Sequence, residues 1–314
     1  MPKTAQRTAL LALIALVLAA ALAAPASAKT NVIVGMGEQH TKVFKQSKYK
    51  ALKIKRVRYF IRWDAMKVSY ARRNADAYVA AAKKAGTRVY MHLSSNDLRY
   101  RKAKLPSIKT FNKWVGRLVK HYRALGVRDW GVWNEANHKS QPTYKSPKRA
   151  AQYFVAFRKL CKGCTIVALD VLDQPRFLNY VDSFYRALPK SQRKYASIVG
   201  LHNYGDTNFY RATSTRAVIQ AVRKYNKRAT FWMTETGGIV NFGKRLPCNT
   251  KRAAKAINYM FKLAKDYRPI KRLYNYNYYG TSCRGFDSGI MTRGGKARSG
   301  YYAFKKGMKG FRLT

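Results

Sequence analysis

The sequence predicts an α/β fold, a single (β/α)8 TIM barrel. Short β-branched or aromatic runs alternate with helical stretches rich in Lys, Arg and Ala. The alternation gives eight units of about 36 residues each, which is the usual size for such a barrel. No linker rich in Pro, Ser or Gly interrupts them. The expected strands are 31–37, 56–63, 88–94, 130–135, 165–172, 197–204, 230–235 and 272–279, and the expected helices are 74–85, 108–125, 146–160, 179–188, 214–225, 250–267 and 298–306.

The first 28 residues are expected to be a signal peptide. Lys3 and Arg7 form a basic region, residues 8–24 are an Ala/Leu-rich apolar run, and residues 26–28 read ASA. The alternative is an uncleaved membrane anchor, for which the run is short. The catalytic domain is then expected over residues 29–314, in a protein that is secreted, either extracellular or associated with the cell wall.

The residues after strand one distinguish the predicted barrel from the alternative of an open doubly wound sheet. Both folds have the same alternation of strands and helices. Such a sheet carries a Gly-rich phosphate turn after its first strand. Here the run 35–40 reads GMGEQH and lacks a third glycine. The sequence therefore favours the barrel.

Four cysteines are the disulfide candidates, and export would place them in an oxidising compartment. Cys161 and Cys164 are read as a short structural disulfide before strand five, with a redox pair as the alternative. Cys248 and Cys283 would then form the second disulfide, between the loops after strands seven and eight. Free buried thiols are the remaining alternative.

Glutamate occurs only three times in the 314 residues, as Glu38, Glu135 and Glu235. All three lie at the carboxyl ends of expected strands: Glu38 directly after strand one, and Glu135 and Glu235 as the last residues of strands four and seven. Barrel enzymes place their chemistry at the carboxyl ends of the strands. A chain with 64 Lys+Arg and 13 Asp+Glu has few acids on its surface, so these three are candidate functional residues.

The runs around two of these glutamates are informative. The run 131–137 reads GVWNEAN, and the run 231–238 reads FWMTETGG. Both resemble the clan A glycoside hydrolases, in which an Asn-Glu pair ends strand four and a glutamate ends strand seven. The resemblance implies that Glu135 is the acid/base, that Glu235 is the nucleophile and that Asn134 binds a sugar hydroxyl. It also implies that the activity is retaining hydrolysis of O-glycosidic bonds.

Two further runs are similar to the clan. Strand two reads VRYFIRW, with Arg58, and residues 202–204 read HNY. The resemblance implies that Arg58 keeps the nucleophile ionised and that Tyr204 hydrogen-bonds it. The eighth strand reads YNYNYY where many members place a tryptophan platform. The residues expected to bind substrate or support the pair are Asn134, Arg58, His202, Tyr204, Trp133, Trp232, Tyr276, Tyr278, Glu38 and His92.

Three of these residues have structural alternatives. Glu38 is either a subsite ligand or a partner for surplus cations. Arg58 could form a structural ion pair in the barrel, and His202 could be a buried core histidine. The loops 240–250 and 280–297 are the longest and are expected to carry subsites.

The remaining sequence patterns exclude other chemistries. The five histidines show no H-E-x-x-H or paired metal spacing, and neither a G-x-S-x-G elbow nor a P-loop occurs. No cofactor and no metal are expected, because glycosidic hydrolysis with two carboxyl groups needs neither.

The formal net charge of +51 predicts an affinity for polyanions without sequence specificity. The expected partners are a poly- or oligosaccharide substrate and an anionic cell-wall polymer, with no specific nucleic acid, no membrane after signal cleavage, and a monomeric state. A general basic bias is the alternative origin of the charge. A non-catalytic barrel that binds cell-wall carbohydrate or polyanion is the alternative function, and the sequence leaves the glycan open.

Overall fold

The structure is a computed structural model that describes residues 30–96 and 103–314. The expected signal peptide lies outside the described residues. Within them, the helices are too short or too polar to cross a membrane.

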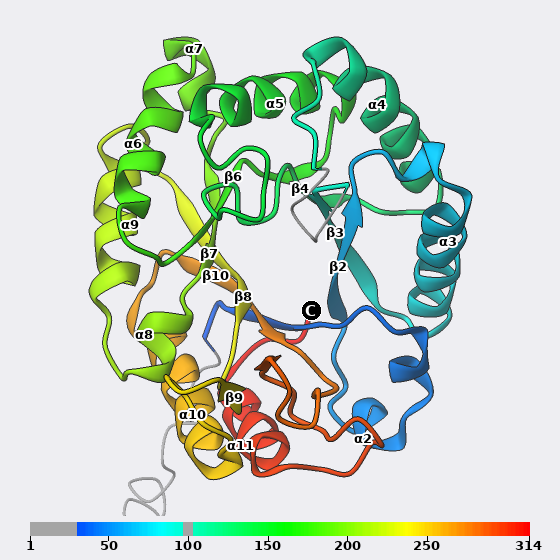
Figure 1. The fold of residues 1–314 in the computed structure, drawn as a ribbon, viewed down its shortest axis with the longest axis vertical. Coiled ribbons are helices and arrows are strands. Elements are labelled where there is room, and N and C mark those ends of the chain that lie inside the picture. Colours follow the sequence, from blue (N-terminus) through cyan, green and yellow to red (C-terminus); the bar gives the residue numbers. More distant parts are fainter. Residues whose placement is uncertain (1–29, 97–102) are drawn as a thin grey trace, which may run out of the picture.

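Parallel strands form one sheet in the order β5-β4-β3-β2-β1-β10-β8-β7-β6, and the helices surround it (Figure 1). The two end strands, β5 and β6, are consecutive in the chain and are separated only by Ala168. They correspond to the one expected strand 165–172. Because β5 pairs with β4 while β6 pairs with β7, the sheet closes on itself. The predicted (β/α)8 barrel is confirmed.

Most elements lie within a few residues of the expected ranges, and β4 is shorter than expected. The sheet strands are β1 Ile33–Gly37, β2 Arg56–Arg62, β3 Arg88–Ser94, β4 Asp129–Gly131, β5 Thr165–Val167, β6 Leu169–Leu172, β7 Ile198–His202, β8 Thr230–Thr236 and β10 Ile270–Tyr276. The α-helices are α2 Ser47–Lys50, α3 Ser69–Lys84, α4 Ile108–Ala124, α5 Pro147–Leu160, α6 Phe177–Ala187, α7 Lys190–Arg193, α8 Tyr204–Asn208, α9 Thr213–Arg223, α10 Thr250–Asp266 and α11 Ser299–Gly307. Three 3-10 helices are η1 Thr41–Lys45, η2 Ala65–Lys67 and η3 Met308–Gly310.

The outer helices begin where the sequence supplies caps. The Ser107 side chain accepts a hydrogen bond from the Thr110 backbone N–H at the start of α4. Asn249 does the same for Arg252 at the start of α10, and Pro147 occupies the first turn of α5. The long helices α3, α4, α9 and α10 bury one apolar face and expose Lys and Arg on the other.

The amino-terminal half of the barrel interior is closed by an ion-pair cluster. Asp129 accepts hydrogen bonds from Arg56 (2.9 Å) and from Arg272 (2.6 Å). The Arg272 guanidinium lies 3.8 Å from the ring centre of Trp232. A layer of buried side chains covers this closed-end cluster from above, formed by Tyr90, Val167, Trp232 and Tyr274.

Both expected disulfides are present. Cys161–Cys164 lies at the end of α5, just before β5. Cys248–Cys283 joins the loop after β8 to the loop after β10. The same two loops pair as a small antiparallel sheet of β9 (Asn241–Phe242) and β11 (Phe286–Asp287).

The acidic side chains are withdrawn from the surface. Of the described Asp and Glu residues, seven are buried and Asp266 alone is exposed. Among the described Lys and Arg residues, Arg58 and Arg298 are buried. The outer surface is therefore almost purely cationic.

Candidate active site

Glu135 stands just beyond β4, where the chain leaves regular strand geometry. β4 ends at Gly131, earlier than the sequence predicts, and the following backbone is held by its neighbours. The Asn134 N–H donates to the Leu93 carbonyl (2.7 Å), and the Ala136 N–H donates to the Asp170 carbonyl (2.9 Å). Glu135 itself has a φ of 44°, in the left-handed region that is unusual for a residue with a side chain. Its N–H donates to Asp170 Oδ1 (3.0 Å), which fixes this conformation.

Glu235 lies near the carboxyl end of β8, held by one donor from β2 and one from the start of α8. Arg58 Nη1 donates to its Oε2 at 2.7 Å, and the Tyr204 hydroxyl donates to its Oε1 at 3.1 Å. Arg58 is fully buried and also donates to the Asn134 side-chain oxygen. The structure therefore brings these four predicted residues together.

His202 links the two glutamates to a third carboxylate. Its Nδ1 lies 3.0 Å from Glu135 Oε1 and 3.8 Å from Glu235 Oε2, while its Nε2 lies 3.0 Å from Asp170 Oδ1. Asp170 is almost fully buried and also accepts from the Thr234 hydroxyl. These contacts place His202 in the site.

Glycines on two strands make room for this cluster. A Cβ at Gly200 in β7 would lie 2.1 Å from Asp170 Oδ2, and one at Gly131 in β4 would lie 2.1 Å from His92 Cδ2. Neither contact is sterically possible. The missing side chains are therefore a condition for burying Asp170 and His92 at these positions.

Burial and charge set the protonation of the histidines in opposite directions. Burial alone would lower the pKa of His202, but the charges of Asp170 and Glu235 outweigh it and raise that pKa to about 10. Burial lowers the pKa of His92 to about 3, and the charge of Arg58 acts in the same direction. His202 is thus a cation at neutral pH, whereas His92 is a neutral ring whose Nδ1 accepts from Arg58 Nε (3.2 Å).

The protonated His202 lowers the pKa of the two carboxyl groups that it contacts, Glu135 and Asp170. Burial alone would raise the pKa of Glu135, but the hydrogen bond and charge of His202 outweigh it and hold that pKa below its usual value. The same two opposing effects act on Asp170, whose pKa is held well below its usual range. Both groups are therefore anions in the free protein.

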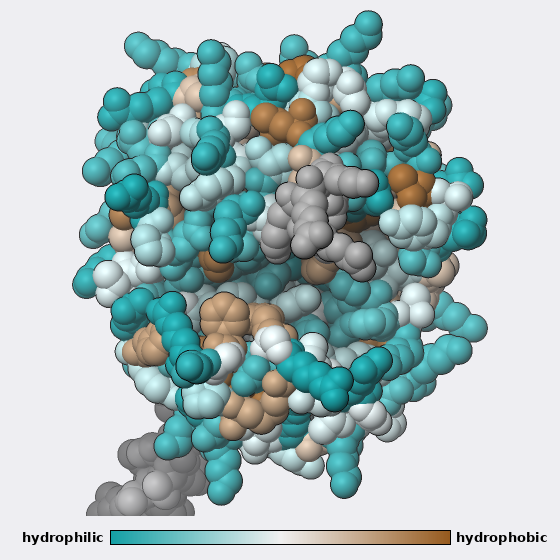
Figure 2. Space-filling model, viewed as in Figure 1, coloured by the Kyte–Doolittle hydropathy of each residue, from teal (hydrophilic) through white to brown (hydrophobic). Residues whose placement is uncertain are grey.

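A cavity of about 990 Å³ opens above the two glutamates. Hydrophilic side chains cover most of this face of the molecule, and less polar side chains gather over the region of β9 (Figures 1 and 2). The lining includes Asn134, Glu135, Tyr204, Glu235 and Tyr276, all of which the sequence predicts. The loops 240–250 and 280–297 contribute as expected, through Phe242, Arg245, Leu246 and Phe286.

The structure corrects the expectations for three aromatic residues. Trp133 is buried, stacks on Tyr153 and donates its indole N–H to Gln141 Oε1 (3.1 Å). Trp232 belongs to the buried layer above the closed-end cluster. Tyr278 is buried against Tyr49. None of the three lines the cavity, because their side chains point into packed layers of the barrel.

Glu38 and His92 also differ from the expected role of substrate ligand. Glu38 is buried and accepts backbone N–H groups of Gln39 (2.8 Å), His40 (3.0 Å) and Tyr279 (3.1 Å). It ties the loop after β1 to the loop after β10. Its ion pair is with His40, not with the surplus of Lys and Arg. His92 acts beneath the cavity by orienting Arg58.

Asp170 is the main residue that sequence reasoning missed. Its signal was an isolated acid within the apolar run ALDVL, in a chain with few acids. His138 and Gln141, which line the cavity, follow the Asn-Glu motif by three and six residues. Phe60, two residues after Arg58, lines it as well. Alternation along β2 could have placed Phe60 on the same face as Arg58.

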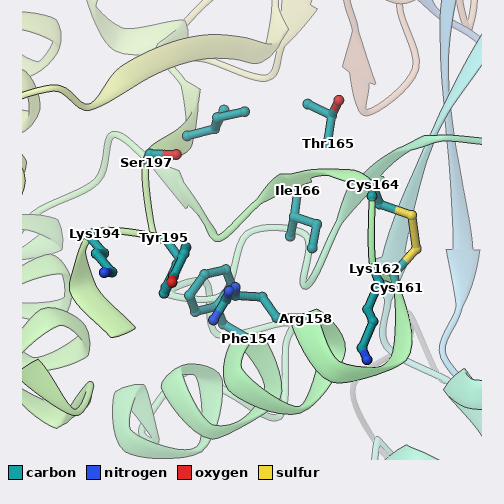
Figure 3. A pocket seen from close by; sticks show the side chains of 12 residues that line it. Phe154, Arg158, Cys161, Lys162, Cys164, Thr165, Ile166, Lys194, Tyr195 and Ser197 are labelled. Carbon is teal, nitrogen blue, oxygen red and sulfur yellow. A yellow bond between two sulfur atoms is a disulfide. The ribbon is translucent and has the colours of Figure 1, made fainter. Parts of the chain in front are cut away.

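A second cavity, of about 460 Å³, lies beside the Cys161–Cys164 disulfide (Figure 3). Its lining includes Phe154, Arg158, Lys162, Lys194 and Tyr195 but no Asp, Glu or His. It offers no pair of carboxyl groups, whereas the larger cavity presents Glu135 and Glu235. The chemistry therefore belongs to the larger cavity.

Glu135, His202 and Glu235 offer ligand atoms within 4.8 Å of one another, a spacing that a metal ion could use. The charges already present oppose such a use. Arg58 occupies Glu235 Oε2, and a protonated His202 cannot be a ligand. The cluster is better described as an ion-pair network that holds two carboxylates close together.

A parallel barrel that presents two glutamates beneath a cavity at the carboxyl ends of its strands has the architecture of barrel glycosidases. Residues 112–297, more than half of the chain, match the family described as glycosyl hydrolase catalytic core. The chain belongs to this family and is a glycoside hydrolase.

Solved structures of low sequence identity share the fold. Native xylanase 10B from Thermotoga maritima superposes with a TM-score of 0.63 at 14% identity, over 89% of this chain and 95% of the xylanase. GH5_18 from Streptomyces cattleya, in complex with GlcNAc, gives 0.61 at 13% identity, over 90% and 80%. Xylanase 10B from Thermotoga petrophila, in complex with xylobiose, gives 0.59 at 11% identity, over 89% and 94%. A search of curated protein sequences finds no significant match.

Proposed function

We propose that the protein is a secreted retaining β-glycoside hydrolase that cleaves a poly- or oligosaccharide by double displacement. The supporting observation is that an oxygen of Glu135 and an oxygen of Glu235 lie within 4.8 Å of each other. Retaining enzymes hold their carboxyl groups about 5–5.5 Å apart, whereas inverting enzymes need about 6.5–9.5 Å to admit a water. The separation leaves no room for that water.

Glu235 is the nucleophile in this proposal. Arg58 and Tyr204 fix its two oxygens and leave the carboxylate facing the cavity. Its oxygen forms a bond to the anomeric carbon as the bond from that carbon to the leaving oxygen breaks. Asn134, whose side-chain oxygen is held by Arg58, is placed to bind a neighbouring hydroxyl.

Glu135 is the acid and then the base. In the free protein the proton lies on His202, 3.0 Å away, since the pKa of Glu135 is lowered and that of His202 is raised. A shift from Nδ1 to Oε1 loads Glu135 with the proton that the leaving oxygen takes. Glu135 then takes a proton from water, whose oxygen displaces Glu235 from the anomeric carbon.

Secretion and a monomeric state complete the proposal. Two disulfides support an oxidising compartment. The charge of +51 supports retention on an anionic cell-wall polymer.

The test uses a panel of chromogenic β-glycosides. Glu235→Gln is expected to lose activity by about 10⁴-fold or more, because an amide cannot attack the anomeric carbon. Glu38→Gln is the matched control, since Glu38 lies outside the cavity, and it should keep kcat within about three-fold per folded molecule. Nuclear magnetic resonance of the first product should show the β anomer.

Two outcomes would contradict the proposal. An α product would exclude retention, and full activity of Glu235→Gln would exclude the nucleophile. Binding of oligosaccharides without turnover of any panel member would favour the alternative of a non-catalytic carbohydrate binder.

A further inference from the structure

The charged side chains around the catalytic cavity are distributed unevenly. Beside Glu135 and His138, the wall formed by β2, β3 and the loop after β4 presents uncharged side chains, Phe60, Ser94, Ser140 and Gln141. The loops after β6, β7 and β8 present Asp173 and three arginines, Arg176, Arg211 and Arg245. We call these three residues the arginine rim.

Two of the three members of the arginine rim, Arg176 and Arg245, have no carboxylate partner among the described residues, whereas Arg211 has one. Arg211 Nε lies 3.7 Å from Asp206 Oδ1, and Arg211 also faces Asp173 across Gly205. Arg176 and Arg245 are exposed, and neither forms an ion pair with any carboxylate of the described residues. Their charge is therefore available to a ligand.

Exposed phenylalanines accompany the arginine rim. Phe209 and Phe242 are 41% and 49% exposed, and the other described phenylalanines are buried or partly buried. Both line the cavity. The guanidinium groups of Arg211 and Arg245 lie 5.7 Å and 5.2 Å from the centre of the Phe209 ring. An apolar ring flanked by cations suits the apolar face of a sugar that also carries a negative group.

The surrounding loops are held in place, so the rim has a defined shape. Phe242 in β9 pairs with Phe286 in β11, and their rings are 5.9 Å apart. The Phe242 N–H donates to the Leu246 carbonyl (2.7 Å), which places Arg245 on a tight turn. The Cys248–Cys283 disulfide closes the same loops.

We infer that the natural substrate is an acidic glycan, whose carboxylate-bearing sugar binds between Arg176 and Arg245 against Phe209 and Phe242. The planar guanidinium matches a carboxylate in a bidentate fashion, which a lysine does not. This inference rests on the proposed function and adds the class of substrate to it.

The experiment measures binding, so that it does not depend on turnover. The Glu235→Gln protein is titrated calorimetrically with β-1,4-linked oligosaccharides of the gluco and manno series. Each neutral compound is compared with its counterpart oxidised to the carboxylate at C6. We expect the carboxylate form to bind about two- to five-fold more tightly in one series, since one partly exposed ion pair contributes up to about a factor of five.

Two double variants, each in the Glu235→Gln background, separate the rim from the general positive field. Arg176→Ala/Arg245→Ala should bring the ratio of the two affinities close to one. Arg73→Ala/Arg228→Ala removes the same charge from exposed positions outside the cavity lining and should preserve the ratio.

Equal binding or no binding in both series would overturn the inference. So would a ratio that survives in the rim variant or disappears in the control. A persistent preference with no turnover by the unmutated enzyme would instead contradict the proposed function and leave the rim as a binding site.

Discussion

The barrel contains two clusters of arginine and carboxylate, one at each end of its interior, and they are built differently. At the closed end, Asp129 is shared by Arg56 and Arg272 beneath a layer of buried aromatic side chains. At the open end, Arg58 and a protonated His202 serve three carboxylates, Glu135, Asp170 and Glu235. The closed end thus has more cations than anions, and the open end has more anions than cations.

This difference shows what separates a structural ion pair from a catalytic one. Arg58 and Arg272 both lie within the barrel, and each contacts a carboxylate at short range, at 2.7 Å and 2.6 Å. Only the open-end cluster keeps a surplus carboxylate in contact with a cavity. A buried ion pair is weak evidence of function by itself, whereas an uncompensated carboxylate beneath a cavity is strong evidence.

Removing one arginine from each cluster should give the largest contrast. Arg58→Met leaves Glu235 without its cation and should lower kcat/KM by about 10²–10³-fold per folded molecule. Arg272→Met leaves Asp129 paired with Arg56, so it should cost about 1–3 kcal/mol of stability and change kcat/KM by less than about two-fold. Urea unfolding and chromogenic kinetics measure the two effects. Comparable losses of activity in both variants would show that the ends are not functionally distinct.

The two disulfides allow the same comparison on stability. Cys248–Cys283 spans 35 residues at the open end, and Cys161–Cys164 spans 3 residues next to the first residue of β5. If a disulfide acts by lowering the entropy of the unfolded chain, replacing Cys248 and Cys283 by alanine should cost about 4 kcal/mol of stability. Replacing Cys161 and Cys164 should cost about 2 kcal/mol. Thermal unfolding of the two double variants tests this. Equal shifts would mean that loop size does not govern either bond.

The third comparison varies the pH, and it concerns the open end alone because the closed-end cluster contains no histidine. The pKa of His202 is raised to about 10, so its contribution is complete below about pH 6.5 and is lost as the pH rises toward 10. The pKa of His92 is lowered to about 3, so its contribution is complete above about pH 6.5 and is lost as the pH falls toward 3. Each slope is at most about 1.4 kcal/mol per pH unit.

Urea unfolding across this pH range, repeated with His202→Gln and His92→Gln, assigns the two slopes. Each variant should flatten one limb of the profile and leave the other. A profile that both variants leave unchanged would show that neither histidine has the protonation inferred from its surroundings.

The sequence predicted the barrel because its period of alternation is a property of the whole chain. The resemblance to the clan A glycoside hydrolases implied that Arg58 and Tyr204 contact Glu235, and both contacts are present. The direction in which a single side chain points was harder to predict from the sequence. Trp133 lies two positions before Glu135, yet both residues lie beyond the end of β4 at Gly131, so strand alternation does not apply there.

Glu38 shows a second limit. The rarity of glutamate in this chain made Glu38 a candidate functional residue. Its role, however, depends on which N–H groups the loops after β1 and β10 bring to it. Those loops are 241 positions apart at the Glu38–Tyr279 contact, and no local pattern encodes their approach. Asp170 was missed for the related reason that its partner, His202, comes from the next strand of the barrel.

The withdrawal of acids from the surface also determines how the molecule behaves as a colloid. Most proteins lose their net charge at some moderate pH because exposed carboxylates and amines balance there. Here the few carboxylates are mostly buried or paired, and the isoelectric point of about 10.5 is set by the lysines and arginines. From mildly acidic to mildly alkaline water the molecules keep nearly the same charge and repel one another. Precipitation by adjusting the pH should therefore fail until the lysines begin to titrate, and added polyanions should instead condense the protein at any ordinary pH.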